Sequence, residues 1–257
     1  MSIARDAAPA AAPPATSAGA RASALLPRTR GERAFAALGL ATAIGMVVSI
    51  WAIFAYAPED ALSGVVQRIF YFHVPLGWDA YLAFFTVFVA SIVYLWRRDE
   101  RWDWLARAAA EIGTVLTTLV LITGSLWGKP IWGAWWRWED ARLTTTLILW
   151  FVYAGYLMLR SYTGRSASGA RAAAVLGIAG FVDVPINYFS VTWWNRLHPA
   201  AIYVVDQGKS SLPPAALTTF MISLTTWTLF FVLLLVLVYH LERVRARLAT
   251  ARALLED

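Results

Sequence analysis

Two histidines stand in segments that are rich in aromatic residues and close to an arginine. His73 lies in the run Arg-Ile-Phe-Tyr-Phe-His-Val-Pro that begins at Arg68, and His198 in Trp-Trp-Asn-Arg-Leu-His-Pro that begins at Trp193. A lone histidine is more often structural than a ligand. Neutral imidazole is nevertheless a good axial ligand for haem iron, and two such segments on opposite faces of one porphyrin would make the iron six-coordinate. The long stretch of chain between them leaves this open from spacing alone.

Basic side chains near these segments could pair with the two propionates of such a ligand, because guanidinium and ammonium groups form charge-assisted hydrogen bonds with carboxylates. The candidates are Arg68, Lys129, Arg142 and Arg196. The third histidine, His240, falls near the end of the last apolar segment, and we interpret it as interfacial structure.

Five tryptophans stand within twelve positions, from Trp127 to Trp138. An aromatic belt at a membrane interface accounts for one or two at each helix end, not for five in one segment. Indole rings are broad, flat and lose little entropy on binding. Because Trp132, Trp135 and Trp136 follow helical spacing, we expect a short helix lying on the membrane surface. Its indole face could be a platform for a planar ligand, a membrane anchor or a docking surface for another protein.

One acid interrupts an apolar segment. Asp183 stands two residues before Pro185, where proline frees a carbonyl and kinks a helix. Acids inside a membrane are costly and often functional, but a hydrogen-bonded structural acid at the kink is an equal alternative.

The elements that must position these residues are apolar. Of the 257 residues, 59% are hydrophobic and only 15% are charged, against about a quarter charged in soluble domains. Six stretches are long enough to cross a bilayer. They predict an all-α polytopic membrane protein with six transmembrane helices, whose shorter spans continue as helix into the interface. The stretches are 34–56, 80–96, 108–127, 143–159, 172–189 and 215–241.

The basic residues fix the expected orientation. With both termini in the cytoplasm, sixteen Lys and Arg residues fall in inner segments and six in outer segments, as the positive-inside rule requires. The outer segments are then 57–79, 128–142 and 190–214, and they contain both aromatic-flanked histidines and the tryptophan cluster.

The chain ends predict two cytoplasmic tails around one membrane domain. Residues 1–33 are rich in Ala, Pro, Ser and Arg and lack the apolar core of a signal peptide, so we expect a disordered tail. Residues 34–245 would form the six-helix domain. The charged run from Glu242 would extend the last helix, with 246–257 as the C-terminal tail.

Several functional classes are excluded by what the sequence lacks. There is no cysteine, hence no disulfide, thiolate metal site or thiol nucleophile. The sequence also contains no P-loop, glycine-rich dinucleotide motif, His-Glu-x-x-His motif or plausible Ser-His-Asp set. These absences argue against an ATPase, a dehydrogenase and a protease.

The run from Trp132 to Thr144, Trp-Gly-Ala-Trp-Trp-Arg-Trp-Glu-Asp-Ala-Arg-Leu-Thr, resembles the "WWD" signature of the haem-handling protein family. Within that group the chain is similar to the haem exporter protein C (CcmC) family of bacterial cytochrome c maturation. The segment around His73 and the segment from Pro185 to His198 share the resemblance, which covers roughly residues 60 to 245.

The resemblance implies a function and a site. Such proteins bind b-type haem non-covalently at the outer face of the bacterial inner membrane and pass it to a periplasmic haem chaperone (CcmE-like). They are not enzymes, and they work with an ABC-type ATPase, a second membrane subunit and a small membrane protein. By resemblance, the axial ligands are His73 and His198, and the platform comprises Trp132, Trp135, Trp136, Trp138, Asp140 and Arg142, with Arg68 and Arg196 nearby.

The signature departs from the usual pattern at one point. The family has Trp-Asp-x-Arg, whereas here Glu139 is inserted between Trp138 and Asp140. On a helix one residue rotates the face by about 100°, so either acid could fill the family role, or Trp138 could face away from the ligand.

Three other functions stay open. An ABC-transporter permease would need a polar path through several helices, and the sequence offers little beyond Asp183. A cytochrome b-like electron carrier would need histidine pairs inside the membrane, and a haem lyase would be longer with further intramembrane histidines.

Overall fold

The computed structural model describes residues 29–194 and 212–256. The chain divides into two units, residues 1–37 and 38–257, which are described separately. In the first, Thr29 and Glu32 form reciprocal side chain–backbone hydrogen bonds of 3.2 and 3.1 Å, a capping box that starts a helix. The helix therefore begins at Arg30, four residues before the expected start of the first span.

Within the described residues the fold is helical, as predicted. Six helices or helix pairs are long and apolar enough to cross a membrane, which confirms a multi-pass membrane protein. They are α2 (Arg30–Trp51) with the π-helix η1 (Ala52–Tyr56), the 3₁₀-helix η2 (Val65–Ile69) with α3 (Phe70–Arg97), α4 (Glu100–Trp132), α5 (Ala141–Thr163), α6 (Ala167–Phe181) with α7 (Asp183–Trp193), and α8 (Pro214–Glu256).

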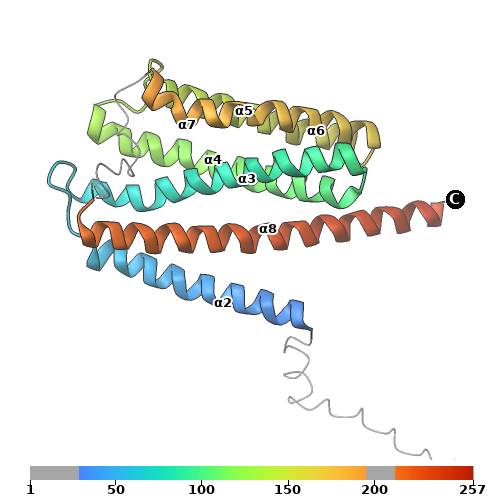
Figure 1. Cartoon of the computed structure of the whole chain (residues 1–257), viewed down its shortest axis with the longest axis horizontal. Helices are drawn as coiled ribbons and strands as arrows, with labels where there is room; N and C mark the ends of the chain where they lie inside the picture. The colour runs from blue at the N-terminus through green and yellow to red at the C-terminus, as the bar shows by residue number, and fades with distance from the viewer. Residues whose placement is uncertain (1–28, 195–211, 257) are drawn as a thin grey trace, which may run out of the picture. The chain divides into compact units, whose positions relative to one another are not determined.

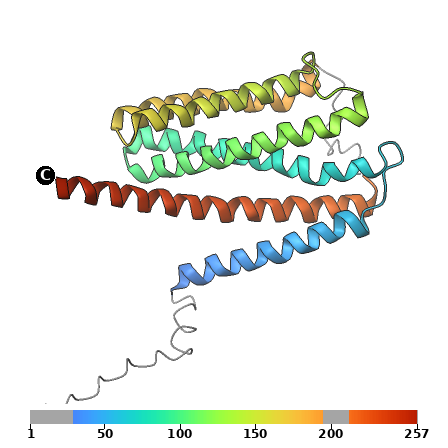
Figure 2. The same cartoon turned by 180° about the vertical axis from the view of Figure 1, so that it is seen from behind.

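In the second unit α3 and α4 lie side by side in the middle. Helices α5, α6 and α7 cover one side of this pair, and α8 covers the other (Figures 1 and 2). We call the end of the unit where α3 begins and α4 ends the outer end, following the predicted topology, and the opposite end the inner end.

Small residues let these helices approach closely. A Cβ on Gly113 of α4 would lie 2.6 Å from Cε1 of Phe84 on α3, and one on Gly177 of α6 would lie 2.8 Å from Val87 Cγ1. The Phe84 ring stacks on Tyr153 of α5 with centroids 3.8 Å apart. Without a hydrophobic driving force between helices in lipid, such close packing is a principal source of their association.

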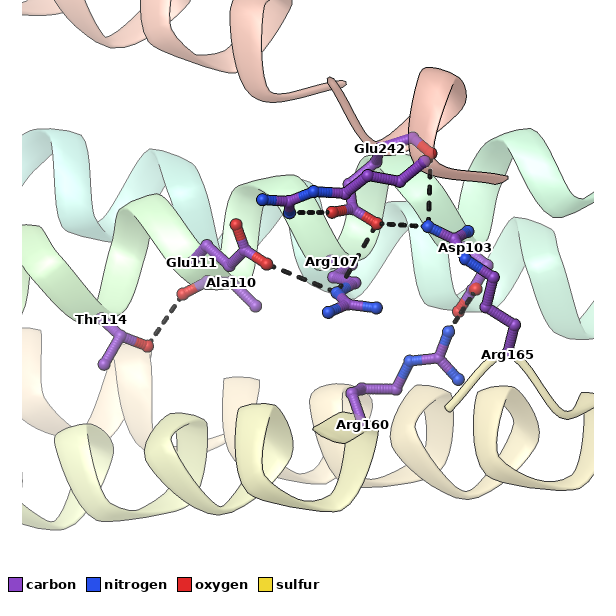
Figure 3. A network of polar contacts seen from close by, with 9 residues as sticks. Asp103, Arg107, Ala110, Glu111, Thr114, Arg160, Arg165 and Glu242 are labelled. Carbon is purple, nitrogen blue, oxygen red and sulfur yellow. Dashed lines mark hydrogen bonds and ion pairs between the residues drawn. The ribbon is translucent and has the colours of Figure 1, made fainter. Parts of the chain in front are cut away.

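The inner end is held by charged groups (Figure 3). Glu242 of α8 is fully buried and receives Arg245, Arg165 and Arg107 at 2.6, 3.2 and 3.6 Å. Because buried ions require paired partners, these contacts tie α8 to α4 and to the α5–α6 connection. We call the group the inner ion cluster; it also contains the Arg160–Asp103 pair at 2.6 Å and the Arg107–Glu111 pair at 3.3 Å.

Helix ends extend beyond the uncharged stretches, as expected for the shorter spans. Asp99 caps α4 by accepting from the Arg101 amide at 3.0 Å, and acids in the first turn favour a helix N-terminus. The last helix runs without interruption to Glu256, which confirms that the charged run from Glu242 extends it.

Candidate functional site

The predicted ligand His73 lies inside α3, in its first turn, rather than in a loop before the helix. The helix begins ten residues earlier than the predicted span. Pro75 is the sixth residue of α3, and because proline has no N–H it leaves the carbonyl four residues earlier without its helical donor. Here that carbonyl belongs to Tyr71, and the buried Ser223 hydroxyl of α8 donates to it.

The His73 ring is oriented by α4. Its Nδ1 lies 2.8 Å from Oγ1 of Thr123, and the Thr123 hydroxyl donates to the Leu119 carbonyl at 2.7 Å. While the Thr123 hydroxyl donates to Leu119, it accepts from Nδ1–H, and in that tautomer the lone pair of the neutral ring is on Nε2. A partner that fixes the tautomer in this way is typical of ligating histidines.

Two further residues of α4 shape the surroundings of this ring. Gly124 faces it so closely that a Cβ there would lie 3.0 Å from His73 Cε1. The Trp127 ring meets His73 edge to face, with centroids 5.7 Å apart, and also contacts Phe70 at 6.1 Å. The candidate ligand is therefore set in an aromatic wall at the outer end.

Arg68 precedes His73 on η2. Its guanidinium carbon lies 5.4 Å from the centroid of the Phe54 ring in η1, a cation–π contact. The turn before η2 is closed by Asp60, which accepts from the amides of Ser63 at 2.7 Å and Leu62 at 3.0 Å. These two hydrogen bonds lower the pKa of Asp60, and the bond from Ser63 has the larger effect.

The prediction of a short interfacial helix in the tryptophan-rich segment is wrong. Helix α4 continues to Trp132 and ends at Gly133, whose φ of 74° is left-handed; from there to Asp140 the chain is irregular. Glycine adopts this conformation without steric cost and stops the helix. Trp132, Trp135 and Trp136 therefore do not share one helical face.

The tryptophans divide into a packed and an exposed set. Trp132 folds back over Gly128, where a Cβ would lie 3.0 Å from its ring. Trp135 and Trp138 are 56% and 70% exposed. Trp136 is half-buried and meets Trp138 at a centroid distance of 5.5 Å. The exposed rings could contact a planar ligand or lipid.

Polar groups brace this segment. Lys129 Nζ lies 5.9 Å from the Trp135 ring centroid and donates to the Gly133 carbonyl at 3.2 Å. Arg137 donates to the Trp132 carbonyl at 3.2 Å. In the described part of the chain, the buried indole N–H groups of Trp127 and Trp136 have no acceptor, as expected of donors that face a ligand or a further segment.

The two acids of the tryptophan-rich signature, where this sequence differs from the family pattern, lie in different environments. Asp140 is fully buried and caps α5 by accepting from the Leu143 amide at 3.1 Å. Glu139 is exposed and lies 3.5 Å from Arg137. The extra residue thus falls in irregular backbone, so the 100° rotation expected for a helix does not apply.

Arg142 lies in the first turn of α5 above a buried amide that was not predicted from the sequence. The Asn187 side-chain nitrogen on α7 approaches the Arg142 carbonyl at 3.0 Å and the hydroxyls of Thr145 and Thr146 at 2.7 and 2.8 Å. Its oxygen accepts from Tyr81 of α3. Asn187 therefore links α7, α5 and α3 just below the outer end. In the sequence, the one feature that could have drawn attention to it is its polar side chain in an apolar segment, two residues after Pro185.

Asp183 is the first residue of α7, directly after the break in the fifth span at Val182, near the position that Pro185 predicts. One of its oxygens, Oδ2, has no hydrogen-bond partner among the described residues. Asp79, which we expected at the end of an outer loop, is instead inside α3, fully buried, and accepts from Thr228 of α8 at 3.1 Å. Its position six residues after His73 could have drawn attention to Asp79 from the sequence.

The second predicted ligand, His198, and the neighbouring Arg196 lie outside the described residues. The structure thus places His73, Arg68, Lys129, Arg142, Asp140 and the tryptophans of the cluster at the outer end of the second unit, and α7 ends at Trp193 at the same end (Figure 1).

Comparison with known proteins decides the family. The model of the family described as heme exporter protein C matches residues 22–254. The chain belongs to this family. Relatives named heme exporter protein C include one from Bradyrhizobium diazoefficiens, 39% identical over 215 residues covering 84% of this chain and 79% of the relative.

Other members of the heme exporter protein C family are similarly related. The Escherichia coli K12 protein is 38% identical over 210 residues, covering 81% of each chain. A putative cytochrome c biosynthesis ccmC-like mitochondrial protein from Marchantia polymorpha is 38% identical over 162 residues, covering 63% of this chain and 66% of the relative. Membership confirms the resemblance drawn from the tryptophan-rich and histidine-containing segments.

Proposed function

We propose that this chain binds haem at the outer face of the bacterial inner membrane and delivers it to a periplasmic haem chaperone during cytochrome c maturation. The observation that carries the proposal is the setting of His73. Thr123 holds its Nδ1 at 2.8 Å, and Trp127 lines its flank. In the tautomer that the Thr123 contact favours, the ring carries its lone pair on Nε2, as an axial ligand does.

The second axial ligand in this proposal is His198. It follows α7, whose outer end is fixed to α3 and α5 through Asn187. In this proposal the fixed α7 positions Trp193, and His198, five residues later, binds the iron opposite His73.

The remaining residues hold the body of the haem. The exposed rings of Trp135 and Trp138 offer flat apolar surface, and the donors without acceptors on Trp127 and Trp136 could meet oxygen atoms at its edge. The propionates would pair with Arg68, Lys129, Arg142 and Arg196. The chain thus orients haem and shields its faces, while bond formation belongs to haem and its acceptor.

The proposed partners follow the family. They are the haem chaperone that receives the cargo, an ABC-type ATPase, a second membrane subunit and a small membrane protein. In this role the chain is a haem-transfer component and not an enzyme.

The test uses the three histidines of the chain. The full chain is purified in detergent, hemin is added, and the absorption spectrum is recorded for wild type, His73→Ala, His198→Ala and His240→Ala. The wild type should give a six-coordinate, bis-histidine spectrum. Each outer substitution should abolish it, and His240→Ala, on the exposed side of α8, is the matched control and should leave it unchanged.

A cellular measurement separates binding from delivery. Haem loading onto the chaperone should fail in the His73→Ala, His198→Ala double variant. Normal loading by that variant would reject both histidines as ligands, and a wild-type spectrum in all three single variants would reject haem ligation by histidine.

A further inference from the structure

A basic pocket lies at the inner end, far along α4 and α8 from the histidine site. It is lined by Arg101 and Trp104 of α4 and by Tyr239, Arg243 and Arg247 of α8. Its volume is about 290 Å³, well above the roughly 30 Å³ that one water molecule takes in the liquid. The Trp104 and Tyr239 rings meet with centroids 6.5 Å apart.

The carboxylates that the structure describes do not balance the charge in this pocket. In the inner ion cluster every arginine faces a carboxylate (Figure 3). By contrast, Arg243 and Arg247 form no ion pair with any residue in 29–194 or 212–256. Of the carboxylates in the described ranges, Arg101 pairs only with Asp99 at 4.0 Å, and its own side chain is 75% exposed. Three guanidinium groups therefore line the pocket with a single carboxylate at the limit of ion-pair distance from one of them.

The pocket also straddles the transition from apolar to charged sequence. Residues 215–241 of α8 contain no formal charge, and the charged run begins at Glu242. The aromatic lining belongs to the apolar side of this boundary on α8, at Tyr239, and the arginines to the charged side. A ligand that fits must carry a negative group next to an apolar body.

We propose that this pocket binds the headgroup of an anionic phospholipid from the surrounding bilayer. The phosphate would receive hydrogen bonds from the guanidinium forks. The part of each acyl chain nearest the headgroup would lie against Trp104 and Tyr239, whose rings are suited to the interface between hydrocarbon and headgroups. This binding is independent of haem and of the two outer histidines.

The test measures lipid binding to the full chain in non-ionic detergent by native mass spectrometry. Phosphatidylglycerol and phosphatidylcholine with the same acyl chains are the probes. The wild type should retain phosphatidylglycerol at least roughly tenfold more tightly. Arg101→Gln, Arg243→Gln and Arg247→Gln combined should weaken that binding roughly 100-fold, with about fivefold from each arginine.

The matched control removes three other arginines from the same end of the protein. Arg97, Arg98 and Arg171 are exposed and do not line the pocket. Their triple glutamine variant has the same net charge as the pocket variant and should bind phosphatidylglycerol as the wild type does. Equal loss in both variants would show a diffuse charge effect and overturn the proposal.

Two further measurements distinguish a bound lipid from a soluble anion and from a protein partner. Displacement of phosphatidylglycerol by inorganic phosphate or glycerol 3-phosphate at micromolar concentration would identify a soluble anion and overturn the proposal. The proposal is also overturned if the pocket variant keeps its preference for phosphatidylglycerol but no longer associates with an ATPase partner, since the surface would then be a protein contact. If the triple variant does not fold, the single Arg243→Gln variant replaces it, and its binding of phosphatidylglycerol should be about fivefold weaker than that of the wild type.

Discussion

Replacing Ser223 with alanine should lower the free energy of unfolding by about 1 to 2 kcal/mol, and replacing Pro75 with alanine at the same time should remove most of that loss. Pro75 has no N–H, so it leaves the Tyr71 carbonyl without a helical donor. The fully buried Ser223 hydroxyl supplies the missing bond from α8. Its removal would strand a carbonyl in an apolar environment.

The magnitude follows from two limits. A buried polar group left without a partner costs about 1–3 kcal/mol in soluble proteins. Hydrogen bonds between helices in membranes average about 0.6 and reach about 1.7 kcal/mol. Because both partners here are buried, the expected loss lies between the upper part of the membrane range and the middle of the range for soluble proteins. In the Pro75→Ala background, the alanine N–H can bond the Tyr71 carbonyl, so the serine becomes dispensable there.

The assay is a double-mutant cycle on the full chain in mixed micelles, unfolded reversibly by SDS and followed by far-ultraviolet circular dichroism. Ser49→Ala is the matched control, because Ser49 is buried at 1% exposure and its hydroxyl has no partner among the described residues. It should cost less than about 0.5 kcal/mol. If Ser223→Ala costs the same with and without Pro75, or no more than Ser49→Ala, the role assigned to the Ser223 hydroxyl is refuted.

Three further outcomes follow from the outer end. Asn187→Leu should lower the free energy of unfolding by about 1–3 kcal/mol in the same SDS assay, because it removes the acceptor of the Tyr81 hydroxyl and the amide that bridges to α5. A cost below about 0.3 kcal/mol would contradict this. Gly124→Ala places a methyl group 3.0 Å from the His73 ring and should weaken hemin affinity about tenfold by spectral titration. A Cβ at Gly155 would have no described atom within 4 Å, so Gly155→Ala should not change that affinity. Equal effects of the two substitutions would argue against displacement of the His73 ring. Since the folded-state pKa of Asp60 is lowered, its turn should be fully stabilised above the ordinary aspartate pKa of about 3.9 and be lost as pH falls through the lowered value. The NMR shift of the amide three residues later should report that titration and lose it in Asp60→Asn.

The spans were predictable because the bilayer imposes length and hydropathy together. An uncharged run such as 215–241 has no alternative but to cross the membrane as a helix. Helix starts were not predictable in the same way, since they depend on local groups that hydropathy does not see. The capping by Asp99 and by Asp140 and the rescue of the Tyr71 carbonyl by Ser223 each extend or begin a helix where composition alone is neutral.

The candidate site was predictable in its residue types but not in its geometry. Tryptophan and histidine stand out in composition, so His73 and the cluster could be named from the sequence. Their support could not, because Thr123 and Asn187 are ordinary residues whose roles arise only when distant helices meet. The helical spacing of Trp132 and Trp135 was misleading, because Gly133 between them adopts a left-handed conformation and ends the helix.

The two ends of the second unit are held by different forces, and this bears on how cargo could enter and leave. The inner end is cross-linked by the inner ion cluster, with a fully buried Glu242 at its centre. Removing one partner of a buried ion pair costs about 3–5 kcal/mol, because the other charge stays buried and unpaired. The outer end relies on neutral hydrogen bonds such as those of Asn187 and on ring contacts, each worth about 1 kcal/mol. We therefore expect local opening to begin at the outer end, where the proposed ligand His73 and the tryptophans lie, while the inner end keeps the helices in register.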